Sequence, residues 1–181
     1  MKKIFLLLLA GGFLSCNQNH QSGRNILRND MIIRHSFYGG RIDFSSFELI
    51  DKDGKTTHMN EIAKERPKLV LRISDTNCRT CIVSIISILM SFSTEIDSSD
   101  IILFITQSNS KYTKLLYHDL RLTFPAYIVP HNLVNNKIET LNEPYLFVLY
   151  PDSTGRNTFI PEKIFPEITN NYLFRISTIF E

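Results

Sequence analysis

The sequence lacks a hydrophobic run long enough to span a membrane. Its longest apolar stretch, Ile4 to Leu14, has 11 residues, and at about 1.5 Å of rise per residue such a helix cannot cross a hydrocarbon core of roughly 30 Å. The stretch follows the basic Met1-Lys2-Lys3, and the small residue Ser15 comes after it. A basic start, a short apolar core and a small residue before the break are typical of an export signal.

The chain also has little net charge, +2 from 20 basic and 18 acidic residues. Removal of residues 1–15 would take away Lys2 and Lys3 and no acid, which leaves 18 basic and 18 acidic residues. This balance does not provide the basic surface that nucleic-acid binding requires, so we expect no nucleic-acid partner. Residues 16–181 are enough for one domain with a substantial core.

Cysteine is scarce, with three residues in the chain, and the first of them is Cys16. The segment Phe13-Leu14-Ser15-Cys16 resembles the lipobox of bacterial lipoproteins, in which the cysteine is lipidated and becomes the new N-terminus. The resemblance implies a signal peptide over residues 1–15, lipid attachment at Cys16 and a tether over residues 16–41. It also implies an extracytoplasmic protein anchored to a bacterial membrane and facing the periplasm. The alternative is ordinary signal cleavage, with Cys16 an incidental thiol.

After a polar stretch at residues 17–30, the sequence predicts strands alternating with helices. The Asp-x-Asp-Gly turn within Asp51–Lys55 is typical of a hairpin. Strands are predicted at 31–38, 68–74, 101–105, 126–129, 145–150 and 157–160, and helices at 59–64, 82–92, 111–122 and 164–180. This order predicts an α/β sandwich with a mixed sheet over residues 42–181.

The motif Cys78-Arg79-Thr80-Cys81 lies where a predicted buried strand gives way to a helix. A helix N-terminus presents unpaired N–H groups and about half a positive charge, and Arg79 adds a full one. Both effects should lower the pKa of Cys78, which makes Arg79 a candidate for tuning the redox chemistry. The i, i+3 spacing brings the two sulfurs together with Cys81 deeper, so we expect Cys78 to attack and Cys81 to resolve mixed disulfides.

Three segments, Phe47–Lys55, Leu69–Cys81 and Glu143–Gly155, together resemble the membrane-anchored, thioredoxin-like thiol-disulfide oxidoreductases of bacteria. Within this family the sequence most resembles the TlpA and ResA type, which includes members that serve cytochrome c maturation. The resemblance implies a thioredoxin-like three-layer sandwich with a mixed central sheet and an N-terminal hairpin extension. It further implies disulfide exchange with exported proteins through Cys78 and Cys81, a membrane thiol reductant as a further partner, and no cofactor.

In that family a cis-proline begins the third segment, lies against the cysteines and has a neighbour whose backbone pairs with substrate. By resemblance, Pro144 would follow a cis bond, and Glu143 and Pro144 would bind substrate. The alternative is a proline that simply begins a strand, where it is tolerated. The sequence also departs from the family, because Asn77 stands where Trp is most common and Arg72 where thioredoxins carry a buried acid. These departures leave the direction of electron flow open.

One other interpretation of the cysteine pair remains, and a second is not indicated. The pair can form a structural disulfide that staples the helix start of a non-enzymatic binding or assembly module, although so small a loop stabilises a fold by only about 2 kcal/mol in the chain-entropy model. A zinc site is not indicated, because the sequence has no second C-x-x-C motif and no paired histidines to supply the missing ligands. We therefore expect no metal.

Overall fold

The computed structural model describes residues 40–106, 115–116, 118–119, 121–129, 138–162 and 165–181. The predicted signal segment, the lipidation site Cys16, most of the tether and the predicted strand at 31–38 lie outside the described residues. The predicted helix at 111–122 is described only in part, and its residues 115–116 and 118–119 are helical.

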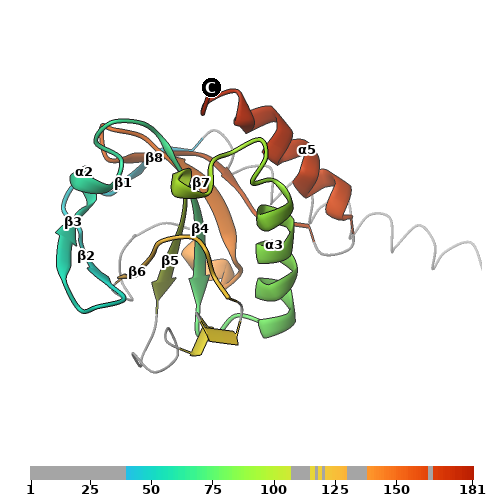
Figure 1. Cartoon of the computed structure of the whole chain (residues 1–181), viewed down its shortest axis with the longest axis horizontal. Helices are drawn as coiled ribbons and strands as arrows, with labels where there is room; N and C mark the ends of the chain where they lie inside the picture. The colour runs from blue at the N-terminus through green and yellow to red at the C-terminus, as the bar shows by residue number, and fades with distance from the viewer. Residues whose placement is uncertain (1–39, 107–114, 117, 120, 130–137, 163–164) are drawn as a thin grey trace, which may run out of the picture. The chain divides into compact units, whose positions relative to one another are not determined.

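A mixed sheet of eight strands forms the centre of the described part of the chain (Figure 1). Its order is β1-β8-β7-β4-β5-β6-β2-β3. The strands β4, β5 and β6 are parallel, and the other neighbours are antiparallel. The bounds are β1 Ile42–Asp43, β2 Glu48–Asp51, β3 Thr56–His58, β4 Lys68–Ser74, β5 Ile101–Thr106, β6 Ala126–Val129, β7 Tyr145–Leu149 and β8 Thr154–Phe159.

Two longer helices, α3 (Arg79–Ser91) and α5 (Pro166–Ser177), lie side by side on one face of this sheet (Figure 1). The short elements are the helix α2 (Met59–Ile62) and the 3-10 helices η1 (Ser98–Asp100) and η2 (Glu139–Leu141). In the described residues no helix has both the length and the apolar character that crossing a membrane requires.

The strand β4 is central because its sequence is apolar enough to be covered on both faces. Its alternate residues Leu69, Leu71 and Ile73 pack with residues of α3 and α5, while Val70 packs on the opposite face. Pairing with β5 on one side and β7 on the other completes its hydrogen bonding. The predicted α/β fold with a mixed central sheet is thereby confirmed.

The opposite face of the sheet is covered by a cluster of aromatic rings. Phe44 stacks on Phe147 with 5.0 Å between ring centroids, and Phe104 meets both rings edge-on. Gly155 lies directly against this pair, since a Cβ added there would stand 2.6 Å from a Phe44 ring atom and 2.8 Å from a Phe147 ring atom. The absence of a side chain at Gly155 is therefore a packing requirement.

The N-terminal part of the domain is only partly as predicted. The β2–β3 hairpin is confirmed, with Gly54 at a left-handed φ of +87° in its turn. Ile42–Asp43, however, pairs with β8 at the other edge of the sheet. The β8 strand itself begins at Thr154, earlier than predicted, because the turn before it closes at Ser153 with a positive φ of 59°.

We expect Gly155→Ala to lower the free energy of unfolding by about 1–3 kcal/mol, because the new methyl group overpacks the aromatic cluster. Denaturant unfolding measures the change. Adding Phe44→Leu removes the Phe44 ring atom that the methyl group meets at 2.6 Å and leaves the Phe147 ring in place. The double variant should therefore lose less stability than the sum of the two single losses. Strict additivity would show that the clash does not govern this position.

Candidate active site

The two cysteines of the C-x-x-C motif lie at the first turn of α3, directly beyond the carboxyl end of β4. Cys78 is the N-cap residue of the helix and is exposed, whereas Cys81 is partly buried. Both side chains are thiols, not joined as a disulfide. The helix is anchored by its apolar face, through Ile82, Ile85 and Leu89 in the core. The predicted placement of the motif is confirmed.

The turn that leads into α3 is closed by Asn77. Its side-chain oxygen accepts a hydrogen bond from the Ser74 N–H at 2.7 Å, and its own N–H donates to the Ser74 carbonyl at 3.1 Å. The N-cap position falls to Cys78. The sulfur of Cys78 consequently faces the N-terminal turn of the helix, where an anion is stabilised.

The pKa of Cys78 is lowered from 9.0 to about 7, mainly by a hydrogen bond from the Cys81 side chain and then by one from the Thr80 side chain. The Thr80 hydroxyl lies 3.0 Å from the Cys78 sulfur. The backbone N–H groups of Cys81 and Thr80 contribute further, which is the effect expected of a helix N-terminus. A substantial fraction of Cys78 is therefore thiolate, the nucleophilic form, near neutral pH.

Arg79, the candidate for tuning this thiol, is not among the main causes of the lowered pKa. Its guanidinium forms an ion pair with the carboxylate of Asp119, and this pairing lowers the pKa of Asp119. Asp119 is 40 positions further along the chain, so no local pattern indicates that it pairs with Arg79. Thr80, which the sequence reasoning did not single out, takes part instead.

The predicted cis bond before Pro144 is wrong, since the described residues contain no cis peptide bond. Pro144 is buried and directly precedes β7, which starts at Tyr145. A proline at this point costs the sheet no hydrogen bond, and the trans form is the more stable one by about 0.5–1 kcal/mol. The alternative interpretation, a proline that begins a strand, describes the structure.

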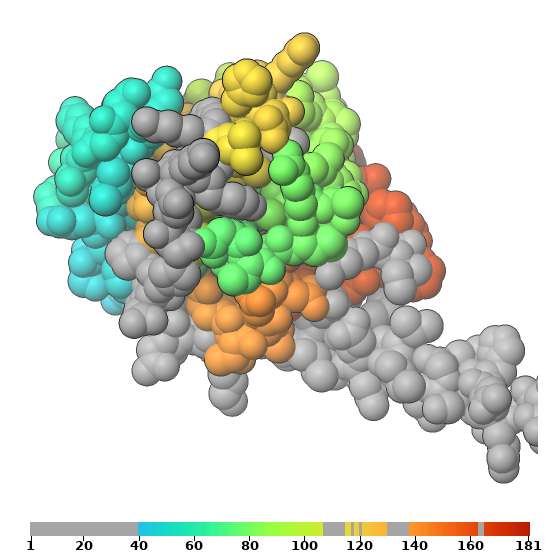
Figure 2. Space-filling model, turned by 90° about the horizontal axis from the view of Figure 1, so that it is seen from below, coloured from blue at the N-terminus to red at the C-terminus, as the bar shows by residue number. Residues whose placement is uncertain are grey.

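Asn142 joins the segment before Pro144 to the cysteine turn. Its side-chain oxygen accepts a hydrogen bond from the Thr76 hydroxyl at 2.7 Å, and its carbonyl accepts one from the Asn77 amide at 2.9 Å. Its φ of 49° is in the left-handed region, which Asn tolerates better than most residues. In Figure 2 the green β4–α3 turn and the orange segment before β7 accordingly lie next to each other. Asn142 was missed because nothing in the sequence pairs it with Asn77.

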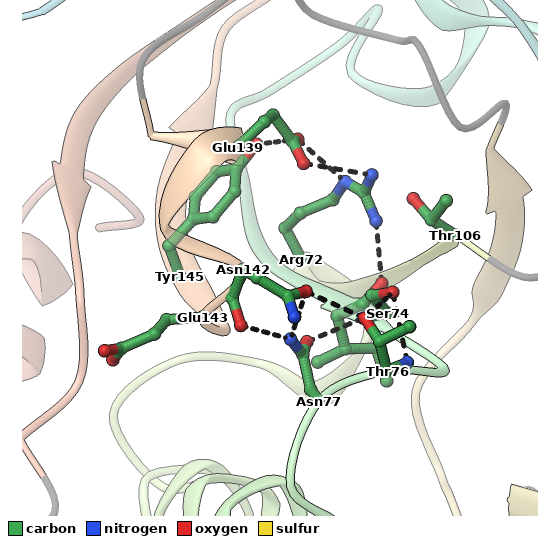
Figure 3. A pocket seen from close by; sticks show the side chains of 10 residues that line it. Arg72, Ser74, Thr76, Asn77, Thr106, Glu139, Asn142, Glu143 and Tyr145 are labelled. Atoms are coloured by element: carbon green, nitrogen blue, oxygen red, sulfur yellow. Dashed lines mark hydrogen bonds and ion pairs between the residues drawn. The ribbon is translucent and has the colours of Figure 1, made fainter.

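Behind this turn, on the face of the sheet opposite α3, lies a buried charged cluster (Figure 3). Arg72 is only 3% exposed, and its guanidinium donates to the Ile73 carbonyl at 2.7 Å and pairs with Glu139 at 3.2 Å. The Tyr145 hydroxyl donates to Glu139 at 2.7 Å, and burial raises the pKa of Tyr145 well above its usual value. Tyr145 thus stays a donor that helps to fix Glu139. The sequence marked Arg72 as unusual but not its partner.

No group of three or more His, Cys, Asp or Glu side chains that could hold a metal ion occurs among the described residues. The described site carries two thiols, Cys78 and Cys81. A nucleophilic thiolate with a second thiol one helical turn along is an arrangement suited to disulfide exchange.

The domain is similar to several solved structures. A thioredoxin-like protein from Porphyromonas gingivalis superposes with a TM-score of 0.55, covering 75% of this chain and 94% of the other at 12% identity. The peroxidoxin BcpB of Mycobacterium tuberculosis gives a TM-score of 0.55, with 79% and 99% covered at 10% identity. A Chlorobium tepidum protein assigned as the thiol:disulfide interchange protein DsbE gives 0.52, with 77% and 99% covered at 8% identity.

These likenesses show that the domain has a thioredoxin-like fold. No protein-family model matches the chain, and no curated protein matches it.

Iodoacetamide should alkylate Cys78 faster than Cys81, with a rate that rises with pH around a midpoint of about 7. Thr80→Val should move this midpoint part of the way toward 9.0, because the thiolate loses one of its hydrogen bonds. Mass spectrometry of the labelled protein at a series of pH values measures both effects. Ser84→Ala, at an exposed position further along α3, is the control and should leave the midpoint in place. Preferential labelling of Cys81 would reverse the assignment of roles.

Proposed function

We propose that this protein is a lipid-anchored, extracytoplasmic thiol-disulfide oxidoreductase that exchanges disulfides with exported proteins through Cys78 and Cys81. The observation that carries the chemical part is the exposed Cys78 thiol with a pKa of about 7, hydrogen bonded to a second thiol at Cys81. A structural cysteine pair needs neither exposure nor a low pKa. The proposal agrees with the assignment of the Chlorobium tepidum protein of similar fold.

In the reductive direction the Cys78 thiolate attacks one sulfur of a client disulfide. A new bond joins Cys78 to the client, the client S–S bond breaks, and the second client sulfur leaves as a thiolate that takes up a proton. Cys81 then loses its proton and attacks the Cys78 sulfur, which releases the first client thiol and leaves a Cys78–Cys81 disulfide. Two electrons pass from the pair to the client. The same steps in reverse oxidise a client dithiol, and the reduction potential of the pair decides the direction.

The segment Glu143-Pro144 is our proposed docking site for the client backbone. The hydrogen bonds between Asn142 and the turn at Thr76 and Asn77 bring it to the cysteine turn. A client strand that approached this segment would present its own sulfur to Cys78. The trans bond before Pro144 does not alter this proposal, which depends on where the segment lies.

The cellular part of the proposal rests on the N-terminal sequence. A short basic start, an apolar run of 11 residues and Cys16 directly after Ser15 together favour export and lipidation. An exported dithiol has to be reduced or oxidised again after each turnover, so a membrane thiol reductant is the partner we propose for the reductive direction. The proposal includes neither a cofactor nor nucleic acid.

A second candidate is a binding or assembly module of the same fold in which the cysteine pair is only structural. The feature that favours it is Asn77 directly before Cys78, because the oxidoreductases that the sequence resembles most often have Trp at this position. Such a module would have no reason to react covalently with other proteins.

Cys81→Ser should trap mixed disulfides between Cys78 and client proteins, because the resolving thiol is gone and outside thiols are scarce in an oxidising compartment. Non-reducing electrophoresis of cell extracts should show adducts of high molecular weight that disappear with reductant. The double variant Cys78→Ser, Cys81→Ser is the control and should show none. A Cys81→Ser protein that runs only as a monomer would favour the binding module.

Cys16→Ser should abolish lipidation, because the acyl chains are attached through that sulfur. Incorporation of radiolabelled palmitate in growing cells measures it. Ser22→Ala, in the polar stretch that follows, is the control and should leave incorporation unchanged. Label that persists in the Cys16→Ser variant would refute the lipoprotein assignment while leaving the redox assignment untouched.

A further inference from the structure

A polar cavity of about 180 Å³ lies beside the cysteine turn, on the face of the sheet opposite α3 (Figure 3). Arg72 and Thr106 line it from the carboxyl ends of β4 and β5, and Glu139 and Tyr145 line it from the segment that leads into and begins β7. Asn77, the residue directly before Cys78, also belongs to its wall. The cavity is smaller than the roughly 300–1,000 Å³ typical of drug-sized ligands, so it suits a single side chain.

Two buried polar atoms of this wall make no hydrogen bond within the described structure. One is the Thr106 hydroxyl oxygen, on a residue only 2% exposed, and the other is Nε of Arg72, on a residue 3% exposed. The Arg72 Nε lies 3.2 Å from a Glu139 oxygen, but its N–H is not aligned for a hydrogen bond. In Figure 3 the Thr106 hydroxyl is turned toward the Arg72 guanidinium. Buried donors of this kind call for an acceptor oxygen.

The charges in the cavity argue that this acceptor is neutral. Arg72 and Glu139 are paired and cancel each other. A carboxylate placed against Arg72 would also face Glu139, and an ammonium placed against Glu139 would also face Arg72, so either charge meets a like charge. Glu143, whose side chain points away from the cluster in Figure 3, adds a further negative charge to the rim.

A carboxamide can form hydrogen bonds with both Arg72 and Glu139 at the same time. Its carbonyl oxygen accepts hydrogen bonds from Arg72 and Thr106, and its NH₂ group donates to the Glu139 carboxylate or to the Asn142 side-chain oxygen. No other uncharged protein side chain carries two donors and an acceptor on one planar group.

We propose that this cavity is a specificity pocket that receives an Asn or Gln side chain of the client, next to the client cysteine that reacts with Cys78. The inference rests on the proposed oxidoreductase function and adds a class of substrate to it. Neighbouring residues of an extended client stand about 3.8 Å apart at their Cα atoms, and Asn77 and Cys78 are likewise neighbours. Successive side chains of an extended client point to opposite sides, and the cavity and α3 likewise lie on opposite faces of the sheet. A client strand that lies beside Asn77 can therefore direct its cysteine to Cys78 and the adjacent side chain to the cavity.

The test uses the reduced full chain and a set of short peptide disulfides in which the residues flanking the single cysteine are Gln, Leu, Glu or Lys. Each rate of exchange with the protein is divided by the rate of the same peptide with dithiothreitol, which removes intrinsic differences between the disulfides. We expect the Gln peptide to react about fivefold faster than the other three, as one or two net hydrogen bonds allow.

The chain offers a matched pair of variants for the same assay. Thr106→Val removes the unpartnered hydroxyl in the cavity, and Thr158→Val removes the similarly buried, unpartnered hydroxyl on β8, which does not line the cavity. The Gln-to-Leu rate ratio should fall to about one in the first variant and stay unchanged in the second. If Thr106→Val fails to fold, the peptide series on the unmodified protein decides alone.

Equal normalised rates for all four peptides would overturn the pocket proposal, and so would a preference for Glu or Lys or a ratio that survives Thr106→Val. These results would leave the oxidoreductase function standing. If no peptide exchanges at all, the oxidoreductase function fails and the specificity pocket fails with it.

Discussion

The strand β4 is hydrogen bonded on one edge to the parallel β5 and on the other to the antiparallel β7, and its residues are buried on both faces. Every part of the candidate site takes its position from that strand. Its carboxyl end delivers the turn that carries Cys78, and its alternation sends Leu71 and Ile73 toward α3 but Arg72 toward the opposite face. The positions of the cysteine pair and of the buried charged cluster, on the two sides of β4, are therefore both set by this one strand.

A guanidinium in such a position has to be compensated, because an unpaired buried charge is strongly destabilising. Glu139 supplies the charge, and the buried Tyr145 hydroxyl orients it. The ion pair between Arg72 and Glu139 joins β4 to the segment before β7. The hydrogen bonds of Asn142 with Thr76 and Asn77 join the same segment to the turn after β4. The two sets of contacts explain how a segment distant in sequence is held beside the cysteines without a cis-proline.

Features of the fold and the site that are determined by a local sequence pattern could be predicted from the sequence. The limits of β4, the start of α3 and the β2–β3 hairpin follow from runs of apolar residues and from the turn at Asp51–Lys55. The low pKa of Cys78 was also foreseen, since it arises within one helical turn. The features that were missed depend on partners far along the chain: the pairing of β1 with β8, Asp119 on Arg79, and Asn142 on Asn77. No periodicity or spacing encodes such partners.

The contrast between local and distant contacts has a consequence for the folding of the chain. The groups that make Cys78 acidic are its own neighbours, Thr80 and Cys81, but a single turn of helix is not stable by itself in water. The helix persists only when Ile82, Ile85 and Leu89 have docked on the sheet, and the sheet is complete only after β7 has inserted beside β4. Until that non-local step is complete, the folding chain carries two ordinary thiols with little thiolate character, so Cys78 and Cys81 exchange slowly with other disulfides while the chain folds.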